Sequence, residues 1–174
     1  LASAERVYEI LDAESTIVDY KDAKPITNLQ KSLSFKNVHF SYEDSKNEVL
    51  KRISFEINRG EVVAVVGESG AGKSTIADLI PRFFEVSDGS IEIDGKDIRS
   101  LKKRSLRALM GIVPQETILF NDTIANNIAY GQSGISENSL RKAALAANAL
   151  DFIEEQPHGF GTVIGDRGVK LSGG

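Results

Sequence analysis

The chain has 174 residues and a formal net charge of −4, from 21 Lys and Arg against 25 Asp and Glu, and it contains no cysteine. This length fits one domain of ordinary size, alone or with a small appendage. With 41% hydrophobic and 26% charged residues, the composition excludes wholesale disorder and low-complexity structure. The lack of cysteine excludes a disulfide framework and a thiolate metal site, and the net acidity argues against a protein that mainly binds nucleic acid.

The first third of the sequence predicts a short helix, a linker and an antiparallel β unit. Residues 2–12 have apolar side chains at helical spacing, and residues 13–32 are polar enough to form a linker. Apolar and polar residues alternate over 33–42 and again over 49–57, which predicts two strands joined by a polar turn. The alternation changes phase at residues 36–37, which predicts a β-bulge.

The rest of the sequence alternates between apolar runs and helical patterns. The run over 61–66 is rich in valine and does not alternate, which is typical of a strand that is buried on both faces. It is also the longest apolar stretch, and it is far shorter than the ~20 residues of a membrane-spanning helix, so we expect no membrane crossing. The further elements are predicted as a helix over 72–84, a strand over 90–94 that ends in an Asp94-Gly95 turn, a helix over 101–108, a strand over 110–113, helical structure over 116–155 and a loop over 156–174.

Between the strand predicted over 61–66 and the helix after it lies a phosphate-binding motif. Residues 67–74 match the pattern G-x-x-x-x-G-K-[ST], in which glycines let the backbone curl around phosphate oxygens with its N–H groups turned inward. A buried strand before the loop and a helix after it are the context that this motif requires. The candidate phosphate-binding residues are Gly67, Glu68, Ser69, Gly70, Ala71, Gly72, Lys73, Ser74 and Thr75.

The side chains at the end of the motif suit three different tasks. Lys73 would reach the β- and γ-phosphates, and the Ser74 hydroxyl would ligate Mg²⁺. Thr75 carries a second hydroxyl, which suits the α-phosphate. Among other proteins with this loop, GTPases are disfavoured because the sequence has no N-K-x-D guanine motif. Small-molecule kinases are disfavoured because the late arginines, Arg141 and Arg167, stand alone rather than in a pair.

Other motifs favour one family of phosphate-loop proteins. The sequence Leu-Ser-Gly-Gly at 171–174 resembles the start of the LSGGQ signature of ABC transporter ATPases, and residues 111–115 resemble their Q-loop. Tyr42, at the end of the first β segment, stands where that family has an aromatic residue that stacks on adenine. Residues 119–128 and 165–168 are similar to the segments after the Q-loop and before the signature in exporter-type members. The chain therefore resembles the nucleotide-binding domain of a lipid or multidrug exporter with fused membrane and ATPase parts, truncated at the signature.

The resemblance covers residues 33–174 and implies an α/β fold of the P-loop NTPase class. This fold has an N-terminal antiparallel β subdomain and an α-helical subdomain, and it would be incomplete after the signature motif. Residues 1–32 would be the end of a membrane-domain helix and a linker. In the ATP-binding domain, the β subdomain and phosphate-loop core would span about 33–115, and the helical subdomain about 116–174.

The resemblance also implies roles for single residues. Tyr42 would stack its ring on adenine, and Gln115 would contact Mg²⁺ or orient the attacking water. Lys73 and Gln115 are thus the candidate catalytic residues, and Ser74 and Gln115 the candidate metal ligands. The signature residues would bind the γ-phosphate of the ATP held by the opposite subunit; they are Leu171, Ser172, Gly173 and Gly174.

For the intact protein, the resemblance implies an ATPase that exports a lipid or another amphipathic molecule at the cytoplasmic face of the inner membrane, with ATP and Mg²⁺ as cofactors. The expected partners are a second nucleotide-binding domain and the protein's own membrane domain, which would contact the Q-loop and residues 116–168; no nucleic-acid partner is expected. The Walker B carboxylates and the switch histidine of the family would lie after residue 174. Residues 1–174, as a soluble fragment, are therefore expected to bind ATP without hydrolysing it.

Two alternatives stay open. One is a non-hydrolysing module whose interactions depend on nucleotide and are transmitted by the Q-loop and residues 116–168. The other is a soluble, non-transport ABC ATPase that acts on DNA or ribosomes. The leading helix and the exporter-like residues 119–128 and 165–168 speak against the second alternative.

Overall fold

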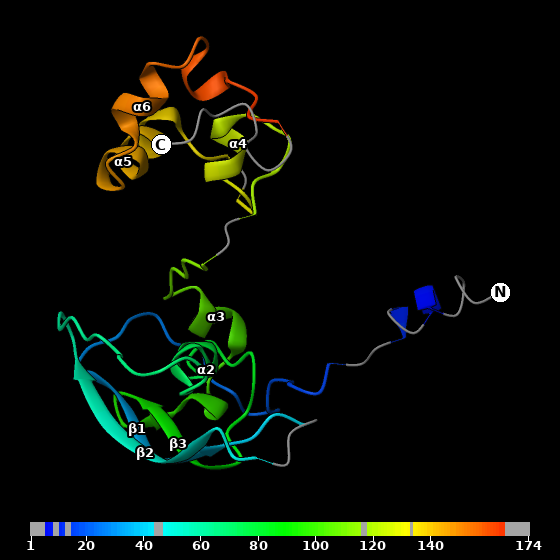
Figure 1. Ribbon diagram of the computed structural model, residues 1–174, viewed down its shortest axis with the longest axis vertical. Helices are drawn as coiled ribbons and strands as arrows, with labels where there is room; N and C mark the ends of the chain where they lie inside the picture. Colours follow the sequence, from blue (N-terminus) through cyan, green and yellow to red (C-terminus); the bar gives the residue numbers. More distant parts are fainter. Residues whose placement is uncertain are drawn as a thin grey trace. The chain divides into compact units, whose positions relative to one another are not determined.

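The computed structural model of this chain describes residues 6–8, 11–12, 15–43, 47–115, 118–132 and 134–165. The chain divides into two compact units, Leu1–Ile112 and Val113–Gly174, of which the first contains a β-sheet and the second is helical (Figure 1). In the described ranges, none of the helices has the length and apolarity needed to span a bilayer.

The sheet of the first unit is antiparallel, as the sequence predicts. Its strands are β1 (Ser32–Phe40), β2 (Leu50–Asn58), β3 (Asp88–Ile93) and β4 (Lys96–Asp97), in the order β2-β1-β3-β4. The predicted bulge is confirmed, because the β1–β2 register shifts between Phe35 and Val38. The predicted turn at Asp94-Gly95 is confirmed too: both residues have positive φ, 52° and 77°, as a tight two-residue hairpin turn requires.

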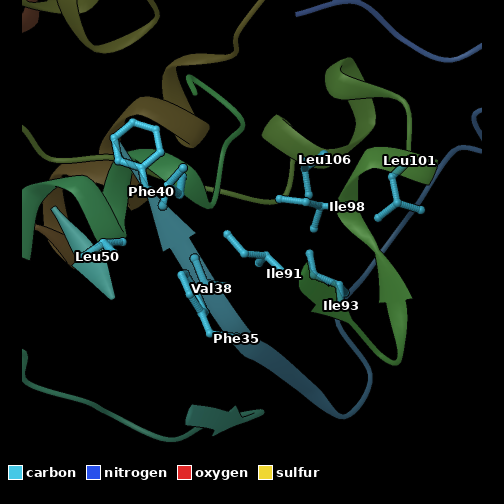
Figure 2. Packing of buried hydrophobic residues seen from close by; sticks show 10 residues of the cluster. Phe35, Val38, Phe40, Leu50, Ile91, Ile93, Ile98, Leu101 and Leu106 are labelled. Atoms are coloured by element: carbon cyan, nitrogen blue, oxygen red, sulfur yellow. The ribbon is translucent and has the colours of Figure 1, made fainter. Parts of the chain in front are cut away.

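The core of the first unit lies between one face of this sheet and the helical segments that cover it. Figure 2 shows Phe35, Val38 and Phe40 along β1 beside Ile91 and Ile93 of β3. The covering segments are α2 (Lys73–Leu79), the 3₁₀ turn η1 (Ile98–Ser100) and α3 (Lys103–Arg107). They contribute the buried side chains of Leu79, Ile98 and Leu106, and Leu101, between η1 and α3, is buried beside them. Burial of about ten apolar side chains holds α2, and with it the phosphate loop, against the sheet.

Two strand predictions are wrong in the structure. Residues 61–66 and 110–113 are coil, and neither segment pairs with a strand in the described part of the chain. Val62 is 97% exposed and Val113 91% exposed, so the first run is not buried on both faces. The physical reason is that a strand forms only when a neighbour accepts and donates its ladder of hydrogen bonds. Apolar composition alone does not supply that neighbour.

Other elements differ from the predictions in length. The helices predicted over 72–84 and 101–108 are found as the shorter α2 and α3. Of the leading helix, residues 6–8 and 11 are helical, and residues 1–5 and 9–10 lie outside the described part. Of the predicted linker, the described residues 15–32 have no helix or strand apart from the first residue of β1. They are nevertheless attached to the unit, because Lys24 forms a parallel bridge with Leu101.

The second unit is helical, as predicted for residues 116–155. It contains α4 (Ile124–Ile128), α5 (Glu137–Ala146), α6 (Leu150–Glu154) and the 3₁₀ turn η2 (Gly159–Gly161), the last of which lies where the sequence predicts a loop. Thr123 and Ser136 cap the N-termini of α4 and α5 by accepting hydrogen bonds from backbone N–H groups. Its core consists of Ile124, Ala144, Ile153 and Ile164.

Candidate functional site

The predicted phosphate loop runs from Gly67 into the first turn of α2. Gly70 and Gly72 have φ of 82° and 87°, in the left-handed region that side chains disfavour. Gly72 also packs closely: a Cβ there would lie 2.7 Å from Leu50 Cδ2 and 3.2 Å from Val49 Cγ1. Glycine at position 72 is thus required by both conformation and space, which explains why the motif has glycine directly before the lysine.

The Lys73 ammonium group is turned back onto its own loop. Its Nζ donates hydrogen bonds to the carbonyl oxygens of Gly67 (2.9 Å) and Glu68 (2.6 Å). The positive charge therefore lies at the start of the loop, and both of these partners are neutral carbonyl groups. Since hydrogen bonds to phosphate oxygens are charge-assisted and stronger than those to carbonyls, a phosphate group entering the loop can replace these partners.

Tyr42 lies beside the same helix. Its hydroxyl is 2.9 Å from Thr75 Oγ1, and Thr75 is only 4% exposed. The structure thus brings the predicted aromatic residue and the phosphate loop together, although 33 residues separate Tyr42 from Thr75. Ser74 is exposed at the start of α2, where its hydroxyl is open to solvent.

The ring of Tyr42 is held by two aromatic residues that the sequence analysis did not select. Phe40 and Phe84 meet it edge to face, with centroid distances of 4.8 Å and 5.2 Å. Such contacts fix ring orientation and add about 1 kcal/mol each. Phe84 falls at the end of the helix predicted over 72–84, and nothing in the sequence marks it as a neighbour of Tyr42.

The remaining predicted residues lie outside the first unit or outside the described part of the chain. Gln115 is exposed and belongs to the second unit, whereas Lys73 and Tyr42 belong to the first. The predicted signature residues 171–174, and residues 166–168 before them, lie outside the described part of the chain. Among the described residues, no three His, Asp or Glu side chains gather as a metal cluster. A magnesium ion that is held mainly by phosphate oxygens and water needs no such cluster, so one hydroxyl from Ser74 fits that mode of binding.

The second unit carries an apolar hollow of about 220 Å³ on its surface. Within it, Phe152 is 39% exposed and Ile128 37% exposed, which is unusual for large apolar side chains that gather at one place. The residues that line it are Leu119, Ile124, Asn127, Ile128, Ala149, Phe152, Ile153 and Ile164. All of them fall within the segment that the sequence analysis assigns to contact with a membrane domain.

Comparisons with known proteins find relatives that match this chain over its whole length. Residues 50–174 match the family described as ABC transporter. The chain is 50% identical to the ATP-dependent lipid A-core flippase of Desulfotalea psychrophila (strain LSv54 / DSM 12343), over 100% of this chain and 30% of the relative. It is 45% identical to ATP-binding cassette sub-family B member 6 of Homo sapiens, over 98% of this chain and 20% of the relative.

A solved structure is similar over nearly the whole chain. The structure of a bacterial Atm1-family ABC exporter with ATP bound matches with a TM-score of 0.88 and 44% identity, covering 99% of this chain and 30% of that one. The chain thus spans no more than 30% of the length of these three proteins.

Proposed function

The chain belongs to the ABC transporter family, and from this premise we propose that it is the ATP-binding domain of an exporter, which in the intact protein hydrolyses ATP to move a lipid or another amphipathic molecule. The single observation that carries the proposal is the arrangement of residues 67–75. The loop carries a lysine ammonium that is bonded to two neutral carbonyl groups, and the hydroxyl of Tyr42 is hydrogen-bonded to Thr75 in the helix that follows. A nucleoside triphosphate has a matching anionic tail and planar base.

Lys73, Thr75 and Tyr42 would each bind a different part of the nucleotide. Lys73 would exchange its two carbonyl partners for oxygens of the β- and γ-phosphates, and Thr75 would donate to the α-phosphate. Tyr42 would present a ring face to adenine while Phe40 and Phe84 hold it from the side. Since the transition state of phosphoryl transfer develops charge on the γ-phosphate oxygens, a fixed ammonium at that place lowers the barrier.

We assign Ser74 and Gln115 as the ligands of Mg²⁺, which when bound neutralises charge on the β- and γ-phosphates. Gln115 would also orient the attacking water. The signature residues 171–174 would complete the ATP site of a second copy of the domain, so two domains would enclose two nucleotides. The order of phosphate loop, Q-loop and signature along the chain supports these roles.

The second unit offers a place for the membrane domain. We propose that the apolar hollow lined by Ile124, Phe152 and Ile164 receives a short helix from the protein's own membrane domain. An apolar groove suits the apolar face of an amphipathic helix. This contact would place the domain at the cytoplasmic face of the membrane, and it would carry the effect of nucleotide binding to the transport path.

We also propose that residues 1–174 bind ATP without turning it over. The family's hydrolysis needs an Asp-Glu pair at the end of an apolar strand, and no Asp-Glu pair occurs in these 174 residues. A phosphate-release assay on this chain is expected to stay at the buffer rate. Turnover that depends on Lys73 would contradict this part of the proposal.

The proposal is tested by titrating the chain with a fluorescent ATP analogue in the presence of Mg²⁺. Replacing Lys73 by alanine removes a charge-assisted contact worth about 1.5–3 kcal/mol, so the dissociation constant is expected to rise at least ~10-fold. The control is Lys96→Ala, which removes an exposed lysine of β4 and is expected to leave the affinity unchanged. Equal affinities of the wild type and Lys73→Ala would remove Lys73 from the site.

A further inference from the structure

Arg82 is the most deeply buried cation among the described residues, at 1% exposure, and the proposed mechanism does not use it. It lies three residues after the end of α2, in the turn that follows the helix, and its backbone N–H donates to the Leu79 carbonyl at 3.1 Å. Its φ of 56° is the left-handed value that usually falls to glycine at the end of a helix. Glycine would adopt this backbone conformation at lower cost, so the contacts of the arginine side chain are what favour arginine at this position.

The guanidinium of Arg82 joins three parts of the first unit. Nε donates to Glu85 Oε1 at 3.0 Å, and Nη2 also bonds that carboxylate. Nη1 lies 3.4 Å from the carbonyl oxygens of Ile98, the first residue of η1, and Leu101, the residue directly after it. Nη2 also reaches the carbonyl of Val18, at 3.5 Å, in the segment that precedes the sheet. The end of α2 is thus tied through one side chain to a segment 64 residues away in sequence.

That segment, residues 17–31, is called the strap here because other bonds fasten it along its length. The Asp19 carboxylate accepts from the backbone N–H of Lys103 at 2.8 Å, at the start of α3. The backbone N–H of Ile26 donates to Ser105 Oγ at 3.1 Å. At the strap's far end, the Asp94 carboxylate accepts from the N–H groups of Gln30 and Lys31 at 2.9 Å and 2.6 Å.

We propose that Arg82 is a positioning residue that makes the strap respond to nucleotide. The inference rests on the proposed function, because the ligand is the ATP held by Lys73 and Thr75 at the other end of α2. The helix has seven residues and is about 10 Å long, and Leu79 anchors it in the core with no exposed surface. Phosphates that hold the first turn restrain the whole rigid helix, and Arg82 passes that restraint to Val18. The strap joins residues 1–16 to the first unit. ATP binding would therefore affect how firmly the chain from residue 17 onward is attached to that unit.

The coupling must be reciprocal. If ATP makes release of the strap rarer by some factor, a released strap must weaken ATP binding by the same factor. The hydrogen bond from Arg82 to the strap and the strap's other hydrogen bonds involve different side chains, so they can be changed separately. Arg82→Lys keeps the charge but cannot reach Glu85 and Val18 together. The double variant Asp19→Ala, Ser105→Ala loosens the strap and leaves Arg82 in place.

The test is hydrogen–deuterium exchange of the 174-residue chain, with and without Mg·ATP, read on peptides that cover residues 17–31. In the wild type, saturating ATP is expected to slow exchange of the strap about fivefold. In Arg82→Lys this ATP-dependent change is expected to disappear, whatever the exchange rate without ATP. The control is Arg104→Lys, an exposed arginine of α3, which is expected to keep the wild-type response.

The outcomes separate the inference from the proposed function. If the wild type does not bind ATP, both are wrong. If it binds ATP and the strap exchanges at the same rate as before, the proposed function stands and the coupling is overturned. If Arg82→Lys does not fold, the double variant Asp19→Ala, Ser105→Ala provides the test. The coupling predicts that its ATP dissociation constant is about fivefold higher than that of the wild type. An unchanged dissociation constant contradicts the coupling. If Arg82 only stabilises the fold, Arg82→Lys would change the exchange rate of residues 17–31 by the same factor with and without ATP. That result would also contradict the proposal.

Discussion

Asp94 illustrates how one side chain fixes the entry of the chain into the sheet. It stands in the turn between β3 and β4, and its carboxylate accepts hydrogen bonds from three successive backbone N–H groups, those of Gln30, Lys31 and Ser32. These bonds favour the ionised carboxylate. The Gln30 amide is the main cause that lowers the pKa of Asp94 below its ordinary 3.8, and the other two amides add to it.

This lowered pKa makes stability depend on pH in a defined direction. A carboxyl whose pKa is lower in the folded state stabilises the fold above its unfolded pKa of 3.8, and that stabilisation is lost as the pH falls through the folded value. Asp94→Asn cannot titrate, so its free energy of unfolding is expected to fall less steeply between about pH 5 and pH 3 than that of the wild type. Urea unfolding measured across this range checks the slope.

The control for this prediction is Asp151→Asn, which removes the same charge from an exposed position on α6. It is expected to keep the wild-type slope. If Asp94→Asn also keeps that slope, the three amides do not stabilise the ionised carboxylate in solution, and this part of the account is wrong.

Single residues also show the reach of sequence reasoning. The motif at 67–74 selects Lys73 from the sequence alone, because glycine spacing and a following lysine are local properties. It does not select Phe84 or Arg82, because their importance comes from contacts made after folding: Phe84 meets Tyr42, and Arg82 meets Val18. A lone arginine or a phenylalanine pair in a sequence carries no sign of such partners.

Among the elements, the pairing of β1 with β3 depends on close backbone approach at Gly89. Its φ is 82°, and a Cβ there would lie 2.3 Å from the Asn37 carbonyl oxygen and 2.5 Å from that of Lys36. These are backbone atoms at the bulge of β1, so they cannot turn aside as a side chain could. The strand pair and its bulge thus leave room for glycine only.

Gly89→Ala is therefore expected to lower the free energy of unfolding by about 3 kcal/mol, from left-handed strain and steric overlap together. Gly95→Ala is the matched variant: its φ is 77°, but no atom lies within 4 Å of the added Cβ, so only the strain remains, about 1 kcal/mol. Chemical denaturation of both variants measures the difference. Equal losses would mean that the close approach at Gly89 relaxes without cost.

The elements also show where sequence patterns fail. Alternation over 33–42 and 49–57 predicts β1 and β2 well, because both pair with neighbours close in sequence. The valine run at 61–66 has the composition of a buried strand, yet its residues remain coil in the described structure. Composition reports what a segment could pair with, whereas pairing itself depends on a neighbour elsewhere in the chain or complex.

At the scale of the whole molecule, the two units carry different parts of the proposed function. The first unit holds the phosphate loop, Tyr42 and the strap, and the second holds Gln115 and the apolar hollow. The sequence places the boundary between the two parts of the domain at about residue 115, so that Gln115 ends the first part, whereas in the structure the second unit begins at Val113 and includes Gln115. The sequence could not predict that residues 17–31, expected as a linker, are fastened to the first unit.

The most direct test of the central claim is a crystal structure of this chain soaked with Mg·ATP. The account predicts that the triphosphate lies within the loop 67–73, with Lys73 Nζ moved from the carbonyls of Gly67 and Glu68 onto phosphate oxygens, and with adenine against the Tyr42 ring. A crystal at saturating nucleotide in which Lys73 keeps both carbonyl partners and the loop holds no phosphate would contradict it.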